Sequence, residues 1–205
     1  MPAIYAEPMA EAFKHLISPA VVATIGAHLQ RVWPAVNRTG FEAQALHGLD
    51  DLELKARVMQ VAQALVATLP ADVDRAAGIL EATLGPAGEG DDLSQWRCGD
   101  AGLAGWPVWP LTEAIALLAA EHHPERGLQA LHAMTQRLTA EFAIRPFIVR
   151  HPAVSLDTLN RWVTDPSAHV RRLVSEGSRP RLPWGLRLQA LVADPSPTLP
   201  LLRAL

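Results

Sequence analysis

The chain has 205 residues, of which 49% are hydrophobic and 19% charged, so it can build a sizeable core and lacks the composition of a disordered protein. Its single cysteine, Cys98, excludes an intramolecular disulfide and a cysteine-rich metal site. No basic segment precedes an apolar stretch at the N-terminus, and no apolar run approaches the roughly 18 residues of a membrane span, so we expect a cytoplasmic protein.

Charge is distributed unevenly along the chain. Residues 1–140 hold nine basic and sixteen acidic side chains, whereas residues 141–205 hold nine arginines against five acidic residues. A local basic surface matters more for phosphate binding than the total charge of −3 does, so the arginine excess indicates a nucleic-acid partner. Charge alone leaves open the alternative that these arginines lie on solvated helix faces and in pairs between helices.

Helical signals begin at Ser18-Pro19, a cap followed by a proline of the first turn, and apolar residues then recur at helical spacing as far as Val32. The pattern predicts further helices over 52–69 and 72–84. Residues 85–110 combine glycine, proline and acidic residues with three tryptophans and predict a long loop. Its tryptophans are expected to pin it to the body rather than bind a ligand; they are Trp96, Trp106 and Trp109.

From Leu111 onward the pattern predicts short helices, and the last third repeats. Asp165-Pro166-Ser167 recurs as Asp194-Pro195-Ser196, 29 residues later, and His151-Pro152 corresponds to Arg179-Pro180 at a spacing of 28. Units of this kind are typical of HEAT-like repeats, which stack helix pairs into a curved solenoid with a concave binding face. We therefore expect a single all-α HEAT-like-repeat domain over residues 1–205, with the earlier helices supplying the rest of its core.

Two short polar segments stand out in this last third. In a predicted helix over 141–150, Glu141 and Arg145 stand four residues apart, as do Arg172 and Glu176 in a helix beginning near His169. Each pair can be an intrahelical ion pair worth about 0.3–0.5 kcal/mol with no catalytic meaning. The alternative is a functional role, and spacing alone does not decide between the two.

The stretch from Thr139 to Pro195 closely resembles the AlkC branch of the AlkC/AlkD family of HEAT-like-repeat DNA glycosylases. The segments that carry the resemblance are Ala140–Phe147, Asp165-Pro166 and His169–Trp184, with further similarity at Leu52–Arg57 and Trp109–Leu111. The resemblance implies a monofunctional enzyme that excises N3-alkylated bases such as 3-methyladenine from duplex DNA without flipping the base. It implies no cofactor.

The same resemblance assigns candidate residues. Glu141 and Glu176 are the carboxylates at family positions, and Trp184 is the aromatic side chain beside the lesion-bearing nucleotide. We expect Trp184 to begin a helix and to be exposed. The side chains expected to contact DNA are Arg145, Arg150, His169, Arg171, Arg172, Ser175, Arg179 and Arg181.

The chemistry fits these residue types, because an N3-alkylated purine is already a good leaving group and needs help mainly for the cationic sugar. A fixed carboxylate beside that sugar supplies it. Family members continue beyond the equivalent of Leu205 and carry another acidic residue there, so a second hypothesis is a catalytically weak or inactive module that binds DNA or a repair partner. Adjacent His122-His123 point to different faces, so no metal site is expected, and a monomer is favoured.

Overall fold

The computed structural model describes residues 13–88, 93 and 97–205, and Trp96 lies outside them. Over these residues the secondary structure is helical, with isolated β-bridges and no named strand, which confirms the all-α prediction. No helix in this part of the chain has the length and apolar character to cross a membrane. The helices are α2 (Pro19–Val32), α3 (Arg38–Leu46), η1 (Leu49–Asp51), α4 (Leu54–Thr68), α5 (Val73–Ala82), α6 (Val108–Ala119), α7 (Pro124–Thr135), α8 (Arg145–Arg150), α9 (Pro152–Trp162), α10 (Ala168–Gly177), α11 (Gln189–Ala193), η3 (Ser196–Thr198) and α12 (Leu199–Ala204).

The first predicted helices are confirmed, and their ends are set by neighbouring side chains. Ser18 Oγ accepts a hydrogen bond from the Val21 amide, so it caps α2 as expected. Asp72 caps α5 in the same way, through a 2.8 Å bond from the Arg75 amide. Helix α3 was not predicted, because its apolar pattern is weak and buries only Phe41 and Ala45.

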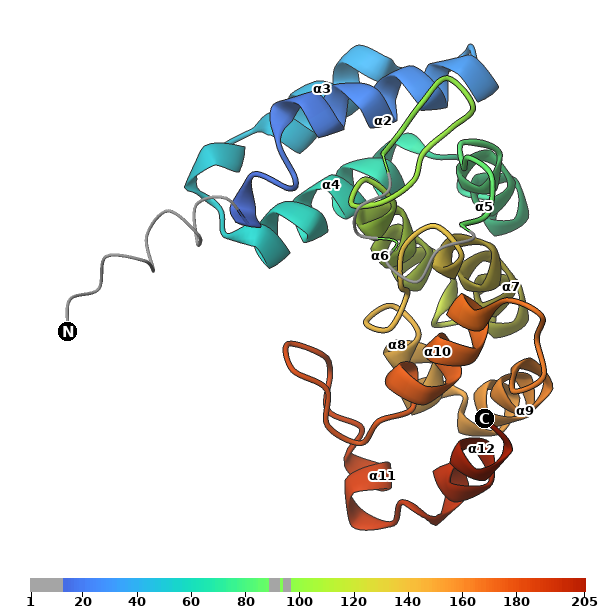
Figure 1. The fold of residues 1–205 in the computed structure, drawn as a ribbon. Coiled ribbons are helices and arrows are strands. Elements are labelled where there is room, and N and C mark those ends of the chain that lie inside the picture. The colour runs from blue at the N-terminus through green and yellow to red at the C-terminus, as the bar shows by residue number, and fades with distance from the viewer. Residues whose placement is uncertain (1–12, 89–92, 94–96) are drawn as a thin grey trace.

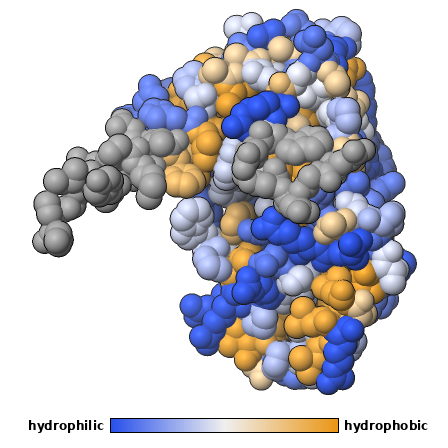
Figure 2. Space-filling model, in the orientation of Figure 1, coloured by the Kyte–Doolittle hydropathy of each residue, from blue (hydrophilic) through white to orange (hydrophobic). Residues whose placement is uncertain are grey.

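The helices stack in chain order into an arc, with α2 and α3 at one end and α11 and α12 at the other (Figure 1). One contiguous core runs through the stack from Ile17 to Leu201. In the orientation of Figure 1, the space-filling view shows a surface of mixed hydrophilic and apolar residues, with apolar surface toward the C-terminal end of the arc (Figure 2). In α12, Leu199 and Leu202 are exposed.

The Asp-Pro-Ser repeat is a repeated turn in the structure. The Asp165 carboxylate accepts from the Ser167 amide at 2.8 Å, and the Asp194 carboxylate accepts from the Ser196 amide at 2.9 Å. The two units differ elsewhere: α9 and α10 form a full helix pair, whereas the second unit has a loop over residues 178–188 and only a five-residue α11. The expected helix start at Trp184 is therefore wrong, because this residue has a left-handed φ of 62° within that loop.

The predicted long loop is present but shorter, since α6 begins at Val108. At Gly102 the loop passes close to the backbone at Gly85. Gly102 has a φ of 151°, and a Cβ there would lie 2.4 Å from the Gly85 nitrogen, so the position requires glycine. Trp109 is 5% exposed and belongs to the first turn of α6, and Trp106 is half-buried against the core. Both tryptophans attach the loop to the body as expected, but they also face a cavity.

Candidate functional site

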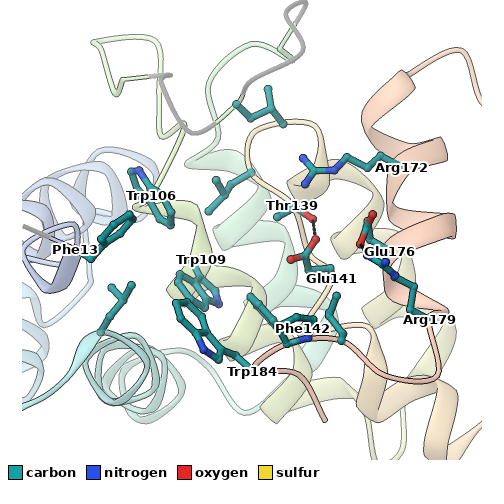
Figure 3. A pocket seen from close by; sticks show the side chains of 15 residues that line it. Phe13, Trp106, Trp109, Thr139, Glu141, Phe142, Arg172, Glu176, Arg179 and Trp184 are labelled. Atoms are coloured by element: carbon teal, nitrogen blue, oxygen red, sulfur yellow. Dashed lines mark hydrogen bonds and ion pairs between the residues drawn. The ribbon is translucent and has the colours of Figure 1, made fainter. Parts of the chain in front are cut away.

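A cavity of about 550 Å³ lies on the inner side of the arc, between the N-terminal and C-terminal helices (Figure 3). Its walls come from the start of α6, the segment 138–142, the last turns of α10 and the loop 182–184. The aromatic residues that line it are Phe13, Trp106, Trp109, Phe142 and Trp184. Its polar residues are Thr139, Glu141, Arg172, Glu176 and Arg179. The fold therefore brings all three predicted catalytic residues to one cavity.

The two carboxylates enter this cavity from different elements. Glu141 lies in the turn before α8, where its Oε2 accepts a hydrogen bond of 3.1 Å from Thr139 Oγ1. Glu176 lies in the last turn of α10 and forms an ion pair with Arg179 at 2.7 Å. Neither of the two intrahelical pairs suggested by the sequence is formed among the described residues. Since α8 begins only at Arg145, Glu141 is not on a helix with it.

Arg145 was expected to contact DNA, and that expectation is wrong because its side chain is fully buried. Its guanidinium donates to the carbonyl oxygens of Gly177 at 3.0 Å, Pro180 at 3.3 Å and Leu186. Burial lowers the pKa of this guanidinium, and the charge of Glu141 acts in the opposite direction. Arg145 thus ties α8 to the end of α10 and to the loop that follows it.

Two further arginines expected at DNA make other contacts. Arg150 pairs with Glu121 at 2.8 Å, away from the cavity lining. Arg171 donates to the carbonyl oxygens of Asp165 at 2.6 Å and Pro166 at 3.1 Å, and so closes the repeated turn. The first contact joins α8 to the segment after α6, and the second joins α10 to the turn directly before it; neither places its guanidinium at the cavity.

The other predicted DNA contacts divide into two groups. His169 is buried, Ser175 is half-buried and Arg181 is exposed, and none of the three lines the cavity. Arg172 and Arg179 do line it, from α10 and just beyond its end (Figure 3). Arg179 is engaged by Glu176, whereas the exposed Arg172 forms no hydrogen bond or ion pair with the described residues. Arg172 is therefore the cation at the cavity that is free to meet an external anion.

An aromatic wall faces the two carboxylates. The rings of Trp109 and Phe142 stack with centroids 5.3 Å apart, and Trp106 lies 6.1 Å from Trp109. Trp184, 67% exposed, stands at the cavity beside them (Figure 3). Sequence reasoning did not assign Trp109 or Phe142 to the site, although both belong to segments that carry the family resemblance.

A third carboxyl group lies behind this wall. Glu113 accepts a hydrogen bond of 3.2 Å from the Trp109 indole nitrogen, which fixes the plane of that ring. Burial raises the pKa of Glu113, while the Trp109 bond and the charge of Lys55 act in the opposite direction. The described residues contain no group of three or more His, Cys, Asp or Glu side chains placed to hold a metal ion.

Comparison with known proteins places this site in context. No family model matches the chain. A curated relative, the uncharacterized protein YhaZ of Bacillus subtilis (strain 168), is 34% identical over 193 residues. The solved structure of Pseudomonas fluorescens alkylpurine DNA glycosylase AlkC, bound to DNA containing an abasic site analog, matches with a TM-score of 0.79 and 30% identity. The chain resembles AlkC in sequence and in fold.

The match to AlkC covers 94% of this chain, so the resemblance inferred from the sequence is confirmed across nearly all of it. The shared region is about half of each relative: the chain spans 49% of AlkC and 49% of YhaZ. The HEAT-like helical stack is thus common to this chain and AlkC.

Proposed function

We propose that this chain excises N3-alkylated bases such as 3-methyladenine from duplex DNA, without drawing the base into a pocket. The observation that supports the proposal most is that Glu141 and Glu176 line one cavity together with an aromatic wall, on the inner face of an AlkC-like arc. AlkC itself was solved with DNA containing an abasic site analog, the kind of product that base excision leaves. Arg172, exposed at the cavity, supplies a cation for a phosphate.

The two carboxylates differ in the charge they present. Glu176 is paired directly with Arg179 at 2.7 Å, whereas Glu141 accepts from the neutral Thr139 hydroxyl and feels the charge of the buried Arg145 only through space. A carboxylate that forms no direct ion pair generates a stronger field at a nearby positive charge than one in contact with a guanidinium. Glu141 is therefore the residue that we assign to stabilising the oxocarbenium-like sugar.

In this scheme the C1′–N9 bond breaks and its electron pair passes to the cationic purine, which leaves as the neutral alkylated base. Water forms the new bond to C1′ and gives its proton to Glu141, which returns it to solvent. The Glu176–Arg179 pair, on the same wall as Arg172, helps to position the strand and the attacking water. The exposed face of Trp184 lies against the lesion-bearing nucleotide, where its π electrons attract the charged base.

The direct test is an excision assay on a duplex oligonucleotide that carries 3-methyladenine, with the undamaged duplex as its control. We expect release of free 3-methyladenine and formation of an abasic site from the damaged strand alone. Tight duplex binding without base release would overturn the glycosylase proposal in favour of a DNA-binding module. Absence of both binding and release would overturn both hypotheses.

Arg172→Gln is expected to weaken binding to any duplex sequence and to lower the slope of log K against log[salt] by about 0.9, the value of one lost phosphate contact. The reason is that Arg172 is exposed at the cavity and has no partner among the described residues. Arg150→Gln removes the same charge from a residue paired with Glu121, and should leave the slope unchanged. Titrations at several salt concentrations measure both; equal slopes for parent and Arg172→Gln would show that this arginine meets no phosphate.

A further inference from the structure

The loop 178–188 that carries Trp184 contains no helix. Within it, the Leu188 amide donates to the Pro180 carbonyl oxygen and the Gly185 amide donates to the Leu182 carbonyl oxygen, each at 3.1 Å. The loop joins α10 to the short α11 and projects toward the inner side of the arc (Figure 1). Trp184 stands in the left-handed region with a φ of 62°, and its side chain is 67% exposed. The backbone does not favour that conformation for a bulky residue, so the turn hydrogen bond across Trp184 and the contacts made from other elements must hold it.

Two cations from different helices contact this loop. From α8, the buried Arg145 donates to the Pro180 and Leu186 carbonyl oxygens, which flank the tip. From α4, the Lys55 ammonium donates to the carbonyl oxygen of Trp184 itself, 129 residues away in the sequence. The loop is thus fixed at its base by Arg145 and at its tip by Lys55.

Lys55 also reaches the aromatic wall. Its Nζ lies 5.7 Å from the centroid of the Phe142 ring, which stacks on Trp109. A small cavity of about 160 Å³ lies between α4 and the loop, lined in part by Lys55, Trp109, Phe142 and Trp184. One ammonium therefore joins the tip of the loop to the wall that faces Glu141.

We propose that Lys55 is a positioning residue, which acts through the Trp184 carbonyl to hold the indole at the mouth of the cavity. It touches no reacting atom, so its influence passes through the placement of Trp184. Its effect on excision rests on the proposed glycosylase function, whereas its effect on Trp184 does not. Loss of this contact should leave DNA affinity close to that of a matched charge-removal variant and reduce the rate of the chemical step.

The test uses Lys55→Met, which keeps an unbranched apolar stem but removes the donor, and Lys55→Arg, which restores a donor. Lys14→Met is the matched control, because it removes the only other lysine of the chain, whose ammonium lies 3.4 Å from the Asp50 carbonyl oxygen. Fluorine NMR of protein labelled with fluorotryptophan reports on Trp184, and Trp184→Phe identifies its resonance. Single-turnover excision is measured on the same proteins.

In Lys55→Met we expect the Trp184 resonance to move and narrow toward that of a mobile indole, with excision slowed about 10-fold to 100-fold. Lys55→Arg should restore both, and Lys14→Met should match the parent. An unchanged Trp184 resonance in Lys55→Met overturns the proposal whether or not the parent excises. A moved resonance in a chain that lacks excision supports the positioning of Trp184 and overturns the glycosylase function. A moved resonance with excision at the parent rate overturns the role of Lys55 in the chemistry.

Discussion

Glu141→Gln is expected to lower single-turnover excision of 3-methyladenine by about 10²–10³-fold, the loss typical of one well-placed electrostatic stabiliser. A carboxylate near the sugar repels DNA in the ground state and helps only as positive charge develops, so affinity for undamaged duplex should stay the same or rise slightly. Glutamine preserves the shape of the side chain and its ability to accept from Thr139 Oγ1. The change therefore removes the negative charge, and with it the proton acceptor for the attacking water, while it keeps the size and shape of the side chain.

Glu176→Gln is the matched comparison, since this glutamate faces the same cavity but is already neutralised by Arg179. We expect a smaller loss of excision than for Glu141→Gln, together with changed DNA affinity because Arg179 is released. Thermal melting checks that neither variant is unfolded. An active parent with Glu141→Gln excising at the parent rate would show that the assignment of Glu141 is wrong, and a larger loss in Glu176→Gln would reverse the two roles.

Arg145→Met is expected to reduce the free energy of unfolding by about 3–5 kcal/mol, because the buried Gly177 carbonyl and two part-buried carbonyls lose their donor and a cavity opens in place of the buried guanidinium. This is a large share of the stability of a typical domain. The contacts of Arg145 with Gly177, Pro180 and Leu186 connect three segments, so the loss should fall mainly on the packing of α8 against α10 and the loop. Urea denaturation measures the change.

Arg150→Met provides the control, because it removes an arginine five residues later whose ion pair with Glu121 is exposed and contributes less than about 1 kcal/mol. Arg145→Lys keeps the charge but offers a single ammonium in place of the planar guanidinium, so its cost should be intermediate. If Arg145→Met is too unstable to fold, the loss of stability is measured by urea denaturation of Arg145→Lys instead. A cost below about 1 kcal/mol for Arg145→Met would show that the carbonyl contacts do not support the fold.

Local hydrogen bonds made the helical architecture predictable from the sequence. The caps at Ser18 and Asp72 and the turns at Asp165 and Asp194 join a side chain to an amide only two or three residues away. Such contacts form from neighbouring residues whatever the rest of the chain does, so the pattern of residue types was enough to reveal them. The long family-like run His169–Trp184 added the resemblance to AlkC, which the structure bears out.

Tertiary packing decided which charged and aromatic side chains are buried and which partners they contact. Arg145 looks like a surface cation in the sequence, yet its acceptors lie 32 to 41 residues away, and only the folded stack brings them around its guanidinium. Glu176 forms its ion pair with Arg179, beyond the helix end, and not with Arg172 in the same helix. Lys55 meets Trp184 across 129 residues. The sequence by itself determined most of the helices, the repeated turns and the arginine excess, because these depend on near neighbours and composition. Which arginines remain free for a ligand, and where Trp184 stands, depended on contacts between segments that only folding brings together.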